Sequence, residues 1–160
     1  MKPTYLPAWH FKHWVCAAAA LALGMQFSSG AHAALGQDAS AVATLQARLG
    51  ASLQIRHRDS YAIHELTAPT GTTVREFVGQ SGKVFAVSWS GGWRPNLRDL
   101  MGTHYDRFIA GTRGRRATRG PVRIELPGMV VVMGGRQRAF FGQVTLTDLL
   151  PAGIGPEDLR

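Results

Sequence analysis

The chain has 160 residues, is 45% hydrophobic and 18% charged, and carries a formal net charge of +8 at pH 7. This length suits one globular domain once a targeting segment is subtracted. The single cysteine, Cys16, precedes the part expected to fold, which excludes a disulfide framework, a thiol nucleophile and a thiolate metal site there.

A secretory signal peptide is predicted at residues 1–33. Two lysines precede an apolar run at residues 15–27, and Ala31-His32-Ala33 has the small-x-small pattern of a leader-peptidase site. The run is shorter than the ~20 residues that a membrane-spanning helix needs, so cleavage between Ala33 and Ala34 is favoured over retention as an anchor. Residues 34–160 would then form one periplasmic or secreted domain with 16 basic and 10 acidic residues, a charge of +6.

The mature chain is predicted to begin with a short helix and a strand. Asp38 is a suitable N-cap for a helix over residues 39–49. The apolar stripe of this helix is thin, so we expect the helix at the edge of the domain. Residues 52–56 are predicted to form a strand with Leu53 and Ile55 pointing inward.

Residues 61–109 show the most consistent pattern, which is three antiparallel strands followed by the main helix. The strands are expected at residues 61–67, 72–78 and 83–89, joined by two short turns that contain glycine. Alternation in the third strand predicts that Phe85 and Trp89 share one heavy face in the core. The helix is expected to start at Asn96 and to cover a sheet face with apolar residues spaced three and four apart. The expected core residues are Phe77, Phe85, Trp89, Leu100 and Phe108.

A basic loop and further strands follow the main helix. Residues 111–120 hold four arginines among glycine and threonine, which is typical of an exposed loop. Strands are expected at residues 122–126, 129–133 and 138–146, and residues 149–160 are expected to wrap around the domain. The predicted fold class is therefore α+β, an antiparallel meander of hairpins with one main helix packed on a face and a short N-terminal helix.

Several segments resemble a known family of small exported proteins of Gram-negative bacteria, domain of unknown function 2844. The matching segments are AALG at 33–36, TVREF at 73–77, GKVFAVSW at 82–89, PNLRDLMG at 95–102, LLPAG at 149–153 and DLR at 158–160. The resemblance spans the whole mature chain and implies a signal peptide, this length and no assigned catalytic residue. The arginine-rich loop departs from what the resemblance implies.

The mature chain contains three histidines, His57, His64 and His104. Two hypotheses follow, a zinc site formed by the three histidines and a hydrolase in which one histidine is the general base. His64 shares the strand face of apolar neighbours, and His104 lies on the apolar stripe of the predicted helix. Packed histidines are therefore favoured over a metal site, and we expect no cofactor. A small periplasmic hydrolase that uses His64 or His104 as its base stays an alternative.

The favoured hypothesis is a non-enzymatic envelope module that binds a protein partner or an anionic surface polymer. Glycines before Trp93 let its loop approach a partner, although packing of this ring over the helix start is the favoured interpretation. Arginine is well suited to phosphate and carboxylate groups, although genomic base composition also accounts for an excess of arginine. A further alternative is a polyanion binder that acts through the arginine loop, although nucleic acid is an improbable partner outside the cytoplasm. The candidate binding residues are Trp93, Arg94, Arg113, Arg115, Arg116 and Arg119.

Overall fold

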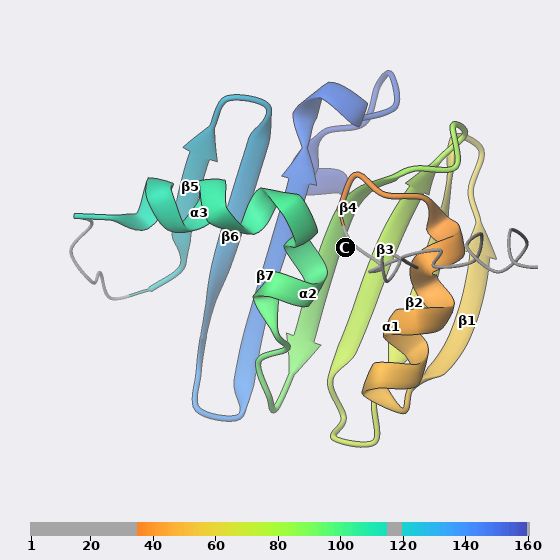
Figure 1. Ribbon diagram of the computed structural model, residues 1–160, viewed down its shortest axis with the longest axis horizontal. Helices are drawn as coiled ribbons and strands as arrows, with labels where there is room; N and C mark the ends of the chain where they lie inside the picture. Colours follow the sequence, from red (N-terminus) through yellow and green to blue (C-terminus); the bar gives the residue numbers. More distant parts are fainter. Residues whose placement is uncertain (1–34, 115–119, 160) are drawn as a thin grey trace, which may run out of the picture. The chain divides into compact units, whose positions relative to one another are not determined.

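An antiparallel sheet of seven strands organises the residues that the computed structural model describes, 35–114 and 120–159. The spatial order of the strands is β1-β2-β3-β4-β7-β6-β5 (Figure 1). Their bounds are β1 (Ser52–His57), β2 (Tyr61–Thr67), β3 (Thr73–Gly79), β4 (Val84–Gly91), β5 (Val122–Leu126), β6 (Met129–Arg136) and β7 (Ala139–Leu146). Two blocks of hairpins meet where β7 pairs with β4. The predicted α+β class and the meander of hairpins are confirmed.

Three predicted features lie outside the described residues. They are the signal peptide at residues 1–33, the cleavage residues Ala33 and Ala34, and the loop arginines Arg115, Arg116 and Arg119. Within the described ranges, no helix is both long enough and apolar enough to cross a bilayer.

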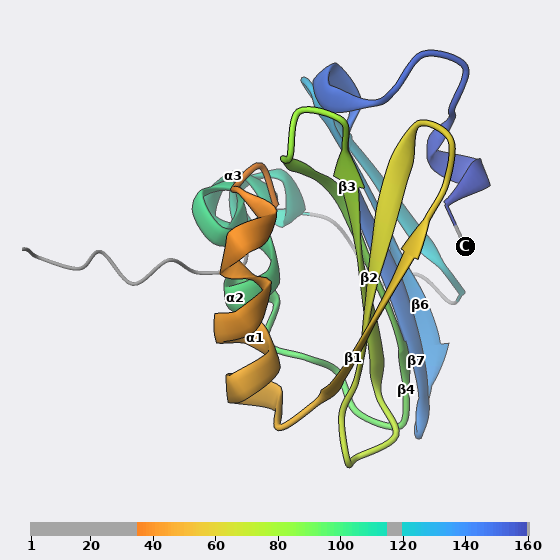
Figure 2. The same cartoon turned by 90° about the vertical axis from the view of Figure 1, so that its right-hand side faces the viewer.

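Helical segments cover one face of the sheet, and the carboxyl-terminal segment lies over part of the other face (Figure 2). The helical segments on the covered face are the 3-10 turn Ala39–Ala41, α1 (Val42–Leu49), α2 (Leu97–Met101), the 3-10 turn Gly102–His104 and α3 (Tyr105–Thr112). Two further 3-10 turns, Thr147–Leu149 and Pro156–Asp158, lie in the carboxyl-terminal segment. As expected for an N-cap, the Asn96 side chain accepts a hydrogen bond of 3.0 Å from the Arg98 N–H. Gly102 has φ +52°, so the predicted main helix bends there into two packed pieces.

The first described residues are already part of the core. Leu35 is fully buried, and its N–H donates to the Leu100 carbonyl at 3.0 Å. The Gly36 N–H donates to the Val84 carbonyl at 2.7 Å, which ties this segment to the start of β4. A Cβ on Gly36 would lie 3.0 Å from Nε2 of His104, and its φ is +81°, so glycine fits this position best.

A β-bulge changes which side chains of β4 share a face. The pairing of β3 with β4 shifts between Phe77 and Val78, so both Phe85 and Ala86 lie on the face away from the helices. The rings of Phe85 and Phe77 lie there with centroids 6.2 Å apart, whereas Trp89 packs under the helices. The prediction that Phe85 and Trp89 share one face is wrong, because strict alternation assumes an unbroken ladder.

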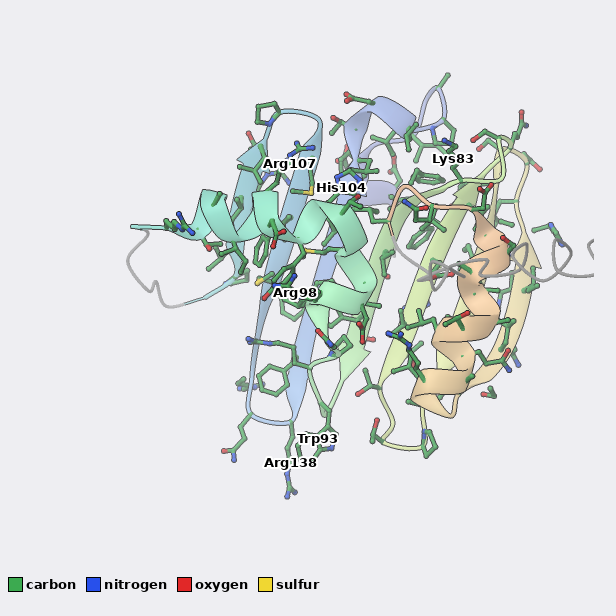
Figure 3. The ribbon with its side chains drawn as sticks, viewed as in Figure 1. Lys83, Trp93, Arg98, His104, Arg107 and Arg138 are labelled. Carbon is green, nitrogen blue, oxygen red and sulfur yellow. The ribbon has the colours of Figure 1, made fainter. Side chains whose placement is uncertain are left out.

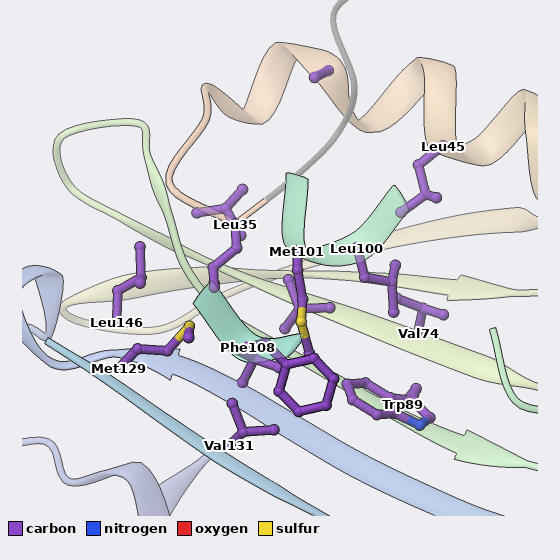
Figure 4. Packing of buried hydrophobic residues seen from close by; sticks show 14 of the residues in the cluster. Leu35, Leu45, Val74, Trp89, Leu100, Met101, Phe108, Met129, Val131 and Leu146 are labelled. Atoms are coloured by element: carbon purple, nitrogen blue, oxygen red, sulfur yellow. The ribbon is translucent and has the colours of Figure 1, made fainter. Parts of the chain in front are cut away.

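The sheet therefore carries two cores. The helix-covered core includes Leu35, Leu45, Val74, Trp89, Leu100, Met101, Phe108, Met129, Val131 and Leu146 (Figure 4). The outer core consists of Ile63, Phe77, Phe85, Ala86 and Leu159, so the carboxyl-terminal segment wraps onto the sheet as predicted. All five residues that the sequence placed in the core are buried.

The edge strand β1 is only partly roofed. Leu53 packs against the helix-covered core, whereas Ile55 is 50% exposed. Ile55 points to the same face as Leu53, as predicted, but it is not buried, because the helix layer reaches Leu53 and leaves Ile55 uncovered.

Candidate functional site

The loop after β4 holds Trp93 at the surface on a fixed backbone. The Thr72 hydroxyl donates to the Trp93 carbonyl at 3.1 Å and accepts from the Trp93 N–H at 3.3 Å. A Cβ on Gly91 would lie 2.6 Å from the Cα of Thr72, so glycine is needed for the loop to pass this close. The Trp93 side chain is 69% exposed although its backbone is held on both sides. An exposed indole on an ordered backbone is well suited to contact a partner.

Arg94 lies beside a second aromatic residue. Its guanidinium carbon is 5.1 Å from the centroid of the Phe140 ring, which is within the range of a cation–π interaction. Phe140 is on β7, directly opposite Gly91 in the register. This contact joins the loop after β4 to the turn that connects β6 with β7.

The β6–β7 turn adds two exposed arginines. Arg136 pairs with Ala139 across the turn, and Arg138 has φ +63°, a conformation that non-glycine residues adopt mainly in tight turns. The side chains of Trp93 and Arg138 project from the same end of the sheet (Figure 3), and a Cβ on Gly92 would lie 3.9 Å from the Arg138 carbonyl. Two segments distant in sequence therefore form one surface.

We call this surface the aromatic–arginine corner, which consists of Trp93, Arg94, Arg136, Arg138 and Phe140. The segments 87–95 and 134–143 that build it contain no aspartate or glutamate. Within the part of the chain that the structure describes, none of its three arginines forms an ion pair. The corner thus combines unneutralised positive charge with exposed aromatic surface.

The structure separates the candidate binding residues that the sequence grouped together. Trp93 and Arg94 lie in the corner, whereas Arg113 follows the end of α3, which packs beside β5 and away from the β6–β7 turn (Figure 1). Arg115, Arg116 and Arg119 lie outside the described residues. Sequence reasoning missed Arg136, Arg138 and Phe140. A basic turn between two strands was visible, but nothing local shows that it meets the Trp93 loop.

Two buried polar side chains face each other across β2 and β3. Glu76 is 0% exposed and lies opposite His64 in the register, and neither of its carboxyl oxygens has a hydrogen-bond partner among the described residues. Burial raises the pKa of Glu76 to about 7. Burial, with a smaller contribution from His57, lowers the pKa of His64. Val74 and Val78 flank Glu76 and belong to the helix-covered core, so this pair is enclosed rather than presented in a polar cleft.

The two histidines considered as general bases lack catalytic partners in the described chain. Neither His64 nor His104 hydrogen-bonds a carboxylate or a serine there, and Nδ1 of His64 has no partner. His104 is half-buried beside Gly36 (Figure 3); burial, followed by the nearby Arg107 charge, lowers its pKa. Across residues 35–114 and 120–159, no group of three or more His, Cys, Asp or Glu is arranged to hold a metal ion.

One comparison with known proteins gives a match. A family model described as a protein of unknown function (DUF2844) matches residues 31–159, which include every helix and strand described above. No curated protein and no solved structure matches the chain.

Proposed function

The chain belongs to the DUF2844 family, and from this premise we propose that it is an exported, non-enzymatic binding module of the cell envelope. The signal-peptide pattern at residues 1–33 supports export to the periplasm or beyond. We further propose that the aromatic–arginine corner binds an anionic envelope molecule that also offers apolar surface, such as phosphate groups carried on a lipid or a lipid-linked polymer.

The composition of the corner carries this proposal. Three arginines without a counter-charge in their own segments attract phosphate, and guanidinium groups bind phosphate oxygens through paired hydrogen bonds. Trp93 has an apolar ring with a polar N–H, a combination that favours the boundary between water and lipid. A ligand with only charge would contact the arginines but not the Trp93 ring, and a purely apolar ligand would contact the ring but not the arginines.

Sedimentation with lipid vesicles tests the proposal. Residues 34–160, which lie within one compact unit, are mixed with vesicles of phosphatidylcholine alone or with phosphatidylglycerol, and in parallel with lipopolysaccharide. We expect binding to phosphatidylglycerol vesicles and to lipopolysaccharide that weakens as salt rises. The R136Q/R138Q variant should bind about 30-fold more weakly, at about 1 kcal/mol for each arginine near an anionic surface.

A matched control removes two exposed charges elsewhere. Arg58 and Lys83 are exposed. Lys83 lies at the end of the sheet opposite Trp93 (Figure 3), and the Arg58 N–H donates to the carbonyl of Tyr61, which pairs with Gly79 at the Lys83 end. R58Q/K83Q therefore changes the net charge equally and should bind nearly as well as the unaltered chain. Equal losses in both variants would show that only total charge matters and would contradict a localised site. Binding to one anionic target alone would identify which molecule carries the recognised phosphate.

The arginine loop provides a separate test of the polyanion alternative. R113E/R115E/R116E should elute from heparin at the same salt concentration as the unaltered chain if the corner is the binding surface. Earlier elution of this variant, with unchanged retention of R136Q/R138Q, would assign polyanion binding to the loop instead.

A further inference from the structure

The face of the sheet away from the helices is only partly covered, and a groove remains beside the covered part. The carboxyl-terminal segment packs on the outer core, and its last described residues 156–159 border a cavity of about 480 Å³ over β3, β4, β7, β6 and β5. This volume falls within the range of small-molecule sites. We call this cavity the outer groove.

The strand register places one row of side chains along the floor of the groove. Arg75 pairs with Ser88, Ser88 with Gln143, Gln143 with Val132, and Val132 with Arg123. These four steps between strands span about 19 Å from the backbone of β3 to that of β5. Small and polar side chains thus occupy the middle of the row, and an arginine stands at each end.

The polar groups of the groove are already oriented. Nε of Arg75 donates to Glu65 at 2.6 Å, which fixes the guanidinium and leaves its terminal amino groups available as donors. Nε of Arg123 donates to Glu125 at 2.7 Å. The amide of Gln143 donates to the Thr145 hydroxyl at 3.1 Å and to the Pro156 carbonyl, so it joins the floor to the carboxyl-terminal segment.

The charges around the groove nearly balance. Glu157 lines the groove, and Glu65 and Glu125 neutralise the two end arginines. Arg56 also pairs with Glu65, at 3.2 Å. Among the residues that the structure describes, three carboxylates therefore stand against three guanidinium groups, so this part of the groove offers many hydrogen-bonding groups but little net attraction for an ion.

An exposed aromatic ring borders this polar floor. Phe141 is 41% exposed and lines the groove, and a Cβ on the neighbouring Gly134 would lie 2.8 Å from its Cζ atom. The ring therefore lies over a glycine on β6 and keeps part of its surface open. Gly142 similarly leaves room for the indole of Trp89 on the helix-covered face.

We propose that the outer groove binds a neutral sugar unit of an envelope glycan, one or two pyranose rings in length. A pyranose ring has an apolar C–H face that packs on an aromatic side chain, and hydroxyls that exchange hydrogen bonds with serine, glutamine, arginine and carboxylate groups. The balanced charge favours a neutral sugar over a uronate or a phosphosugar. This inference is independent of the aromatic–arginine corner, because none of the five corner residues lines the groove.

Titration by NMR tests this site. The ¹⁵N-labelled domain is titrated with maltose, cellobiose, N,N′-diacetylchitobiose and digalacturonate as the charged comparison. We expect at least one neutral disaccharide to bind with millimolar affinity and to shift the amides of Ser88, Ser90, Phe141 and Gln143, including the Gln143 side chain. The proposal would be overturned if none of the four sugars shifted an amide signal at a sugar concentration 20-fold above about 1 mM.

Variants separate the groove from other surfaces. Phe141→Ala should weaken binding about ten-fold, whereas Ile55→Ala, which removes another exposed apolar side chain from the opposite face, should leave affinity unchanged. Ser88→Val should fill the floor and abolish binding without changing the fold. Unchanged affinity in Phe141→Ala and Ser88→Val, or tighter binding of digalacturonate, would contradict a neutral-sugar site. R136Q/R138Q should still bind the disaccharide. The groove proposal and the vesicle-binding proposal can therefore be contradicted independently of each other.

Discussion

The two faces of the sheet are formed by alternate residues of the same strands, yet they have different environments. The helix-covered face is packed with large apolar side chains, and Glu76 and His64 are buried within it. The outer face has a smaller core under the carboxyl-terminal segment and a polar groove beside it. The presence or absence of a covering segment, rather than the strand itself, decides whether a face becomes core or remains available for binding.

The largest expected effect comes from removing a side chain of the helix-covered face. Phe108 is buried on α3, and Phe108→Ala should lower the free energy of unfolding by about 3–5 kcal/mol, because it removes apolar contacts and leaves a cavity. The matched variant is Phe141→Ala on the open part of the outer face, which should cost about 1 kcal/mol or less. Urea denaturation of both variants measures the difference. Similar losses would mean that the groove is part of the core.

A second effect depends on pH and concerns Glu76. Its pKa in the folded protein is about 7 against an ordinary value of 4.5, so the folded state keeps a proton that the unfolded state releases. The stability from this group is fully present below about pH 4.5 and is lost as the pH rises through 7. The loss is about 3 kcal/mol, at 1.36 kcal/mol for each unit of pKa.

Glu76→Gln isolates this effect, because the amide cannot ionise. His64 and His104 have lowered pKa values, so their contributions to stability change in the opposite direction, falling as the pH drops. The quantity to measure is therefore the difference in unfolding free energy between the variant and the unaltered chain from pH 4.5 to 8. This difference should shift in favour of the variant as the pH rises. A difference that does not change with pH would show that Glu76 ionises in the folded state without cost.

The sequence was sufficient to predict the strands, the helix start at Asn96 and the buried aromatic residues, because these depend on local periodicity and capping. It could not predict that Phe85 changes face, since the bulge arises from the pairing of β3 with β4. Glu76 could have been noticed, because alternation places it between Val74 and Val78 on an apolar face.

The candidate site was predictable only in part. The glycines before Trp93 singled it out as a candidate, although packing over the helix start was favoured; the structure instead leaves Trp93 69% exposed. Arg136, Arg138 and Phe140 join it through strand pairing between segments that are distant in sequence. The outer groove depends on five strands in register and on the course of the carboxyl-terminal segment, which no local pattern encodes.

A smaller effect is expected at Gly142, which lies on β7 opposite Trp89. A Cβ there would lie 2.1 Å from the Trp89 ring, so Gly142→Ala should displace the indole and cost about 1–3 kcal/mol. Gly92→Ala is the control, because its Cβ would have no neighbour nearer than 3.9 Å. Thermal unfolding and near-ultraviolet circular dichroism should detect the change in the first variant only. Equal behaviour of the two variants would place the Trp89 ring elsewhere.

The quenching of tryptophan fluorescence by acrylamide tests the central claim, that the aromatic–arginine corner is the binding surface. After residue 33 the chain has two tryptophans, the buried Trp89 and the exposed Trp93, so acrylamide quenches mainly Trp93 in the free domain. When phosphatidylglycerol vesicles are added, we predict that Trp93 becomes protected from acrylamide and that its emission moves to shorter wavelength. Unchanged quenching while the domain sediments with the vesicles would contradict the account, because the protein would then bind through another surface.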